Sequence, residues 1–228
     1  MVVLPAALLA VLVAALFGCT QDSEEVDAEV VVAESVAAMQ ELETFHFAYE
    51  VEKPAGSDPA EGLEIIALEG DVTVNGEMEA TVDVQQSGIP LQISFIAVGG
   101  THYLQFPGAP TWQQVSEGES PLGPLNLSAG TIRILERLQD LAFEGQEEVD
   151  GVTAYRLSGL APAEDVEAIA QAVDRTDPFA AEVWIAVEDH LVHRIRLEGA
   201  ATEGEPEGTI RHISLTDFDT PVQIEPPS

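Results

Sequence analysis

The stretch that decides the fold is EMEATVDVQ, residues 77–85, in which apolar and polar side chains alternate without a break. One set of alternate residues is apolar: Met78, Ala80, Val82 and Val84. The other set is polar: Glu77, Glu79, Thr81, Asp83 and Gln85. Because successive side chains of a strand point to opposite faces, this period of two predicts a strand with one dry and one wet face. Such strands are typical of antiparallel sheets.

Three further segments repeat the alternation, and short turn signals separate the strands. The segments are LQISFIAV at 91–98, FAAEVWIAV at 179–187 and LVHRIRLE at 191–198. The turn signals are Asn75-Gly76, Ser87-Gly88, Gly99-Gly100, Asp150-Gly151 and Glu188-Asp189. Trp184 is out of phase with its apolar neighbours, so we expect it on the convex face, beneath a loop. Arg194 and Arg196 should point outwards and pair with acidic neighbours.

The turn at Asn75-Gly76 tests how the strands are paired. A two-residue loop would pair Thr73 with Met78 and place apolar and acidic residues on one face. A three-residue loop with a glycine bulge pairs Val72 with Met78 instead, which keeps the apolar residues together. We therefore favour the bulged loop. The decapeptide at 199–208 is interpreted as an exposed hairpin tip.

The first helix is expected over residues 24–42, with Asp22 or Ser23 as its N-cap. Its buried stripe follows the helical period through Val26, Val30, Ala33, Ala37 and Gln40, with Val36 and Met39 beside them. Two more helices should interrupt the strands. Ser128 would cap one of them, and Pro162 would open the other, which reaches Val173.

Together these patterns predict an α+β fold with a single, strongly curved antiparallel sheet and about three helices on its concave face. A curved sheet of this kind can enclose an apolar cavity. A fully packed core is the alternative, and periodicity alone leaves both open. The sheet would line a cavity with Met78, Val82, Val84, Leu91, Ile93, Phe95, Val183 and Ile185. The helices would line it with Ile132, Leu135, Val166 and Ile169.

The N-terminal residues indicate export and lipidation. An uncharged apolar run, residues 2–17, ends in Leu16-Phe17-Gly18-Cys19, which has the pattern of a lipobox. We predict a lipoprotein signal peptide at 1–18, an acylated tether at 19–23 with Cys19 lipidated, and one domain at 24–228. The alternative is a chance cysteine after an ordinary signal peptide. Residues 1–18 contain no Lys or Arg, which departs from the usual basic start of a signal peptide.

The charge balance excludes several classes of function. The chain has 41 acidic and 8 basic residues, a formal net charge of −33. Nucleic acid is a poor partner, because phosphate binding needs clustered cations. His190 and His193 flank a turn and should point to opposite faces, so we expect no metal site there. No nucleophile elbow or phosphate loop appears, and we expect neither enzymatic activity nor a cofactor.

Several motifs, in order along the chain, resemble the LppX/LprG family of lipid-carrying lipoproteins. They are the lipobox LFGC, GGTHYLQFPGAPTWQQV, VDGVTAYRLSG, AAEVWIAVEDHLVHRIRLEG and ISLTDFDTPVQIEPP. The resemblance implies a half-barrel whose cavity takes up acyl chains of lipids or glycolipids. It also implies a lipid-anchored protein on the extracytoplasmic side of the cell membrane, and an export transporter or acceptor protein as a further partner.

Arg133 and Arg137 lie four residues apart on the predicted second helix. They could meet a lipid headgroup at the cavity mouth, but pairing with surface carboxylates such as Glu136 or Asp140 is the favoured alternative. Two other functions remain open beside the lipid carrier. One is a localisation-factor-like carrier of acylated proteins, and the other is a structural or adhesive acidic surface lipoprotein without a cavity.

Overall fold

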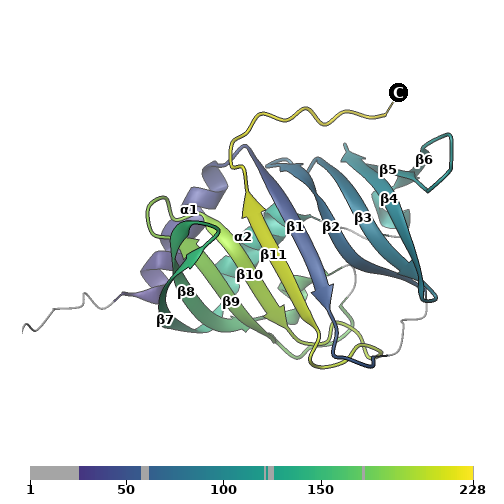
Figure 1. Cartoon of the computed structure of the whole chain (residues 1–228). Coiled ribbons are helices and arrows are strands. Elements are labelled where there is room, and N and C mark those ends of the chain that lie inside the picture. Colours follow the sequence, from purple (N-terminus) through teal and green to yellow (C-terminus); the bar gives the residue numbers. More distant parts are fainter. Residues whose placement is uncertain (1–25, 58–61, 121, 123–125, 171–172, 228) are drawn as a thin grey trace, which may run out of the picture.

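The computed structural model describes residues 26–57, 62–120, 122, 126–170 and 173–227. In this part of the chain, eleven strands form one antiparallel sheet (Figure 1). The first six strands are β1 Thr44–Glu52, β2 Leu63–Thr73, β3 Met78–Gln86, β4 Ile89–Val98, β5 Thr101–Gln105 and β6 Gln113–Ser116. The other five are β7 Gln139–Val149, β8 Val152–Ala161, β9 Phe179–Ala186, β10 Val192–Glu198 and β11 Ile210–Thr216.

Two meanders build this sheet and meet at its centre. The spatial order is β6-β5-β4-β3-β2-β1-β11-β10-β9-β8-β7, so the first strand pairs with the last. The edges are β6 and β7, and the sheet is open between them. Helix α2 (Leu127–Arg137) lies in the connection that takes the chain from one edge of the sheet to the other.

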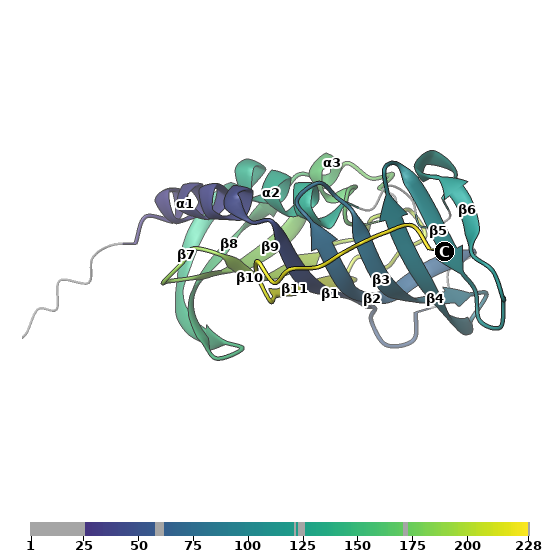
Figure 2. The same ribbon diagram turned by 90° about the horizontal axis from the view of Figure 1, so that it is seen from above.

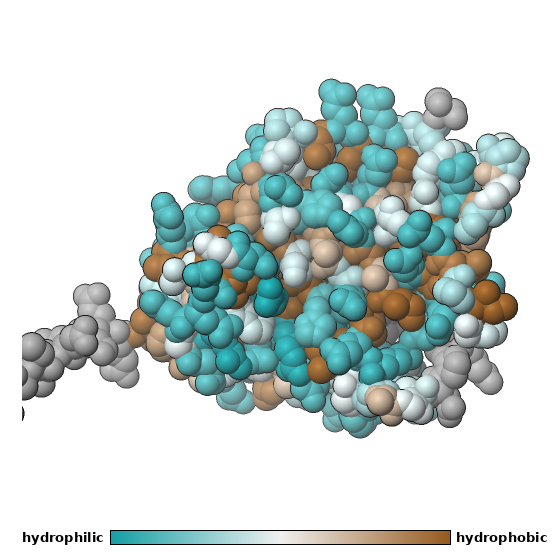
Figure 3. Space-filling model, in the orientation of Figure 1, coloured by the Kyte–Doolittle hydropathy of each residue, from teal (hydrophilic) through white to brown (hydrophobic). Residues whose placement is uncertain are grey.

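The α-helices lie together on one side of the curved sheet (Figure 2). Besides α2 they are α1 (Ala28–Glu41) and the single turn α3 (Ala163–Val166), and a short 3₁₀ turn spans Glu117–Glu119. The predicted fold class is confirmed in its architecture: α+β, one large open antiparallel sheet and helices against one face. The opposite face is mostly hydrophilic where Figure 3 views it.

The side chains of residues 77–85 alternate between the buried and the exposed face of the sheet, as predicted. Met78, Val82 and Val84 are fully or almost fully buried, whereas Glu79 and Asp83 are exposed. The β2–β3 connection is the three-residue loop, because Val72 pairs with Met78. The Thr73 N–H donates to the carbonyl of Glu77 at 2.9 Å, and Gly76 adopts a positive φ of 80°. Glycine takes this conformation without steric cost, which allows the bulge.

The predicted start of the first helix is wrong, and its predicted buried face is only partly correct. Helix α1 begins after Asp27, whose side chain accepts hydrogen bonds from the N–H groups of Glu29 and Val30. The proposed caps Asp22 and Ser23 lie outside the described residues. The face that packs on the protein consists of Val31, Val32, Ser35 and Met39. Most of the predicted stripe faces away, with Val30 51% exposed, but Val26, Val36 and Met39 pack against the core.

The caps and lengths of the other two helices also differ from the prediction. Asn126 caps α2 by accepting from the N–H of Ala129 at 3.0 Å, while Ser128 is buried inside the helix. Pro162 does open α3, but the α-helix ends at Val166. The chain continues in a tighter turn there, since the Ile169 N–H bonds to the Val166 carbonyl three residues back.

The convex face holds Trp184, as predicted, although a strand rather than a loop covers it. Its indole N–H donates to Glu147 of β7. The guanidinium groups of Arg156 and Arg194, on the two neighbouring strands, lie 5.8 and 5.9 Å from the ring centroid. Arg194 pairs with Asp150, and Arg196 with Glu182 and Glu198, so the predicted outward ion pairs are confirmed.

Candidate functional site

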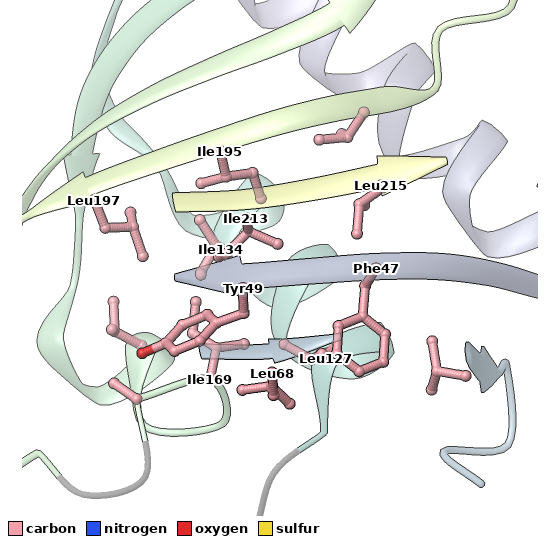
Figure 4. Close-up of a cluster of buried hydrophobic side chains, with 14 of the residues drawn as sticks. Phe47, Tyr49, Leu68, Leu127, Ile134, Ile169, Ile195, Leu197, Ile213 and Leu215 are labelled. Carbon is pink, nitrogen blue, oxygen red and sulfur yellow. The ribbon is translucent and has the colours of Figure 1, made fainter. Parts of the chain in front are cut away.

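The concave face of the sheet and the helices above it form one continuous apolar layer (Figure 4). In the close-up, Phe47 and Tyr49 of β1 lie beside side chains of β10 and β11. From the helix side, Leu127 and Ile134 of α2 complete the layer. The side chains named in the figure are exposed by 4% or less. This layer is the candidate site, because it contains the large continuous cluster of buried apolar side chains in the described part of the chain.

The structure brings all twelve predicted cavity-lining residues to this layer. Ten are exposed by 1% or less: Met78, Val82, Val84, Ile93, Phe95, Leu135, Val166, Ile169, Val183 and Ile185. The remaining two, Leu91 and Ile132, are partly buried and pack against the others. Their role in ligand binding stays a prediction, but their common location is as expected.

These side chains contact one another closely in this conformation. A chamber wide enough for an acyl chain would leave its lining accessible to a water-sized sphere, and the ten buried residues are not accessible in this way. The described part of the chain therefore shows the lining of the predicted cavity as a packed layer. An open cavity is not shown, so it remains a prediction. Ligand entry would require the helices to move away from the sheet and from one another, because the lining residue Ile169 also lies against Gly130 of α2.

Helix α2 is closely joined to the segment that contains α3. A Cβ atom at Gly130 would come within 2.6 Å of the Ile169 Cγ2 atom and 3.2 Å of the Ala168 Cβ atom, so glycine allows the close approach. Arg137 adds ion pairs to Glu164 at 2.6 Å and Asp165 at 2.9 Å.

The predicted headgroup arginines therefore have different surroundings. Arg137 pairs with α3, not with Glu136 or Asp140, while Arg133 is exposed on the same helix. Burial raises the pKa of the Asp165 carboxyl, and Arg137 acts in the opposite direction. Arg137 thus counteracts the effect of burial on this carboxyl and links two helices of the layer.

Three buried polar atoms near this layer have no hydrogen-bond partner among the described atoms: Ser35 Oγ, His102 Nδ1 and Thr131 Oγ1. Ser35 and Thr131 belong to the buried faces of α1 and α2. The His102 ring lies edge-on against Phe95 at 4.9 Å, and burial lowers its pKa. The sequence analysis did not select these residues. The sequence did contain one indication of the burial of His102: it lies two residues before Leu104, on the apolar side of a strand with alternating polarity.

The other chemical candidates do not converge on a site. The described ranges contain no group of three or more His, Cys, Asp or Glu residues placed to hold a metal. His190 pairs with Glu34 at 3.2 Å, whereas the His193 ring contacts Phe218 at 5.2 Å. Among the helices of the described ranges, none has the length and apolar character needed to cross a membrane. Cys19 lies outside the described residues.

Fold and site together define a class: half-barrels in which helices cover the apolar concave face of an open antiparallel sheet. A profile of the LppX_LprAFG lipoprotein family matches residues 27–224. The chain belongs to this family.

Relatives and solved structures agree with this assignment. The lipoarabinomannan carrier protein LprG of Mycobacterium leprae is 28% identical over 172 residues, covering 73% of this chain and 70% of the relative. The LprG of Mycolicibacterium smegmatis is 25% identical over 233 residues, covering 97% and 94%. The crystal structure of LprF from Mycobacterium bovis has a TM-score of 0.67 at 17% identity, covering 88% of this chain and 97% of that one. LppX from Mycobacterium tuberculosis has a TM-score of 0.62 at 19% identity, covering 87% and 98%.

Proposed function

We propose that this protein is an exported, lipid-anchored lipoprotein that carries acyl chains of lipids or glycolipids between the sheet and its helices. The observation that carries the proposal is the continuous apolar layer on the concave face, covered by the helices. Relatives named as carriers of lipoarabinomannan support the same class of ligand.

The physical basis is the cost of exposing an acyl chain to water. This cost is roughly 0.8 kcal/mol per CH₂ group, so a chain of about 16 carbons carries roughly 12 kcal/mol. A protein that receives the chain in a dry site removes most of this barrier to transfer between membranes. No covalent bond is made or broken, so the proposed activity is non-catalytic.

The unpartnered polar atoms of the layer also favour a site that accepts a ligand. A buried hydroxyl without a partner costs about 1–3 kcal/mol. Ser35 and Thr131 place two such hydroxyls on the helices that face the sheet. Ester and hydroxyl groups of a lipid would supply the missing partners when the helices separate.

The anchor belongs to the proposal as well. Residues 1–18 would be removed as a signal peptide, Cys19 would carry the diacylglycerol, and residues 24–228 would form the lipid-binding domain. The acidic exterior, with a net charge of −33, would be repelled by an anionic bilayer surface. The anchor then provides the attachment on the extracytoplasmic side, and an export transporter or acceptor protein would receive the cargo.

Organic extraction followed by mass spectrometry tests the carrier directly. The chain lacking residues 1–19, which retains every described residue, is purified from a lipid-containing host and extracted. We expect acyl lipid at near-equal molar amounts. A clean extract, together with failure to take up lipid from labelled vesicles, would refute the carrier and favour a surface scaffold. Substituting Phe for Val82, in the packed layer, should lower the recovered lipid, whereas Phe at exposed Val74 serves as the matched control.

A further inference from the structure

Arg211 breaks the pattern of its strand. In β11 the residues that face the helices are Arg211, Ile213 and Leu215, so a cation occupies a position that is otherwise apolar. Its cross-strand neighbours are Val51 of β1 and Leu197 of β10. All eight Lys and Arg residues lie within the described ranges, and Arg211 is the one that is buried, at 4% exposed. A charged group in this place needs an anionic partner.

That partner is a carboxylate from the same chain. Both Glu205 oxygens lie 2.7 Å from the Arg211 Nη2 atom. One of them also accepts the Ala201 N–H at 2.5 Å, and Arg211 Nη1 donates to the Gly199 carbonyl at 3.0 Å. The buried Nε–H of Arg211 has no acceptor among the described atoms. The guanidinium therefore retains a free donor while it holds one carboxylate.

The pair of Arg211 and Glu205 lies at one end of the apolar layer, in surroundings that suit the headgroup of an amphiphile. The guanidinium lies 5.7 Å from the centroid of the Phe179 ring. Tyr49, whose side chain belongs to the layer in Figure 4, lies near it. Burial raises the pKa of Tyr49 to about 12, with Arg211 acting in the opposite direction, so its hydroxyl stays protonated. One end of the layer thus combines apolar rings with positive charge and a hydroxyl donor.

Glu205 lies on the β10–β11 connection, which the sequence analysis interpreted as an exposed tip. That interpretation is wrong for Ala200 and Ala201, which are exposed by 5% or less, whereas Glu203, Gly204 and Glu207 are exposed as predicted. The connection folds over the end of the layer, since the ion pair with Arg211 draws it inwards. A few polar contacts hold its outer side: the Glu203 N–H donates to Asp174, and Glu207 pairs with Arg175. The Asp174 N–H also donates to the Ala201 carbonyl at 3.0 Å, so the connection is held over the end of the layer by polar contacts.

We propose that Arg211 binds the carboxylate of a fatty acid, and that Glu205 occupies this position when the site is empty. The inference rests on the proposed lipid-carrier function and adds the class of headgroup that the layer accepts. The acyl chain would extend from Arg211 into the apolar layer, past Tyr49 and Phe179.

The exchange of one carboxylate for another explains why such a site can operate in a very acidic protein. Removing the partner of a buried arginine is strongly unfavourable, because an uncompensated charge remains. When a fatty acid replaces Glu205, the guanidinium stays paired throughout, and Glu205 returns to water, where its charge is well solvated. The planar fork of an arginine matches a carboxylate in two-point geometry, which a neutral headgroup cannot reproduce.

The test compares three single-chain lipids that differ in headgroup: oleate, neutral 1-monooleoylglycerol and 1-oleoyl-lysophosphatidate. Binding is measured by equilibrium dialysis to the chain lacking residues 1–19, at about 0.15 M salt to screen the net negative charge. We expect oleate to bind at least tenfold more tightly than monooleoylglycerol. Glu205→Gln should raise oleate affinity about tenfold, because the competing resident anion is lost while a similar side-chain volume remains.

The decisive variant removes both charges together, since Arg211→Met alone would leave Glu205 buried and unpaired. A double variant, Arg211→Met with Glu205→Met, avoids this and often preserves folding. It should lose the preference for oleate and bind monooleoylglycerol within about twofold of the parent, which shows that the fold is intact. Arg194→Gln, on the convex face and paired with the surface carboxylate of Asp150, is the control and should change neither affinity.

Other outcomes separate this inference from the proposed function. Equal binding of oleate and monooleoylglycerol, or a preference that survives in the double variant, overturns the role of Arg211 and leaves the carrier in place. Tighter binding of lysophosphatidate than of oleate overturns the carboxylate assignment. If none of the three lipids binds, the carrier function fails, and the inference fails with it.

Discussion

Locking α2 to the segment after α3 should stop the protein from loading lipid. The perturbation is the pair Gly130→Cys and Ala168→Cys in the chain lacking residues 1–19, where no other cysteine remains. The distance from an ideal Cβ atom at residue 130 to the Ala168 Cβ atom is 3.2 Å. Disulfides prefer a separation of about 3.5–4.5 Å, so a shift of a few tenths of an ångström is needed. The Ile169 side chain must also move, since its Cγ2 atom lies 2.6 Å from the added Cβ.

The stabilisation by the disulfide must be compared with the cost of the added side chain at residue 130, in the oxidised and in the reduced protein. The cross-link closes a loop of about 40 residues, which corresponds to about 4 kcal/mol in favour of the oxidised folded state. Overpacking at residue 130 costs about 1–3 kcal/mol in both redox states. The oxidised protein is therefore expected to be at least as stable as the parent. A slower loading rate after oxidation would then reflect restricted movement of the helices. It would not reflect unfolding, because oxidation is expected to stabilise the folded state.

The assay follows uptake of a fluorescent lipid from vesicles by the same protein sample, before and after reduction. We expect the oxidised form to load at least tenfold more slowly and the reduced form to recover most of the parent rate. The parent chain under the same reducing conditions is the control. Equal loading rates in the two redox states would refute the reasoning, since they would show that α2 and α3 need not separate.

Other predictions concern stability and the anchor. Arg137→Gln should lower the free energy of unfolding in urea by about 1–2 kcal/mol by removing the cation beside a buried carboxylate, while Arg133→Gln should change it by less than about 0.5 kcal/mol. Leu135→Ala should cost about 2–5 kcal/mol in the same experiment because it opens a cavity in the layer. Burial lowers the pKa of His46, but the neighbouring carboxylates of Asp71 and Glu69 have the larger combined effect, so the pKa is raised above its ordinary value. The stability it adds is therefore full below pH 6.5 and lost as the pH rises through the raised value, and His46→Gln should flatten that part of the urea-midpoint profile. Cys19→Ser should abolish incorporation of labelled palmitate, and retained label would contradict the anchor assignment.

The alternation of apolar and polar residues predicted most of the sheet. In residues 77–85 it identified the buried face, and the need to keep apolar residues together selected the pairing of Val72 with Met78. These predictions succeed because side-chain direction in a strand follows from backbone geometry alone. The predicted turns at 87–88, 99–100 and 150–151 also lie between strands in the structure.

Helix α1 shows where local patterns fail. Its sequence, AEVVVAESVAAMQE, offers apolar residues around most of the helix, so two different stripes satisfy the helical period. Contacts with α2 and β7 decide between them, and these partners are distant in the sequence. The stripe through Val31, Val32 and Met39 is buried, and the one through Val30 is not.

The candidate site was predicted in its apolar part and missed in its polar part. Hydrophobic residues in phase with a strand were sufficient to locate the lining. Arg211 was not found, because its burial depends on Glu205 in a connection that the composition favours as a solvent-exposed turn. A cation in phase with Ile213 and Leu215 was the one available signal.

The pairing of β1 with β11 makes completion of the fold depend on residues 210–216. The two meanders share this one junction, and its strands are separated by nearly the whole described sequence. Such distant contacts slow folding, because the intervening chain must be ordered before they form. A nascent chain that has not yet released residues 210–216 would keep two unpaired central strand edges, on β1 and β10. It would therefore stay incompletely folded, with exposed sheet edges open to other strands, until these seven residues are free to pair.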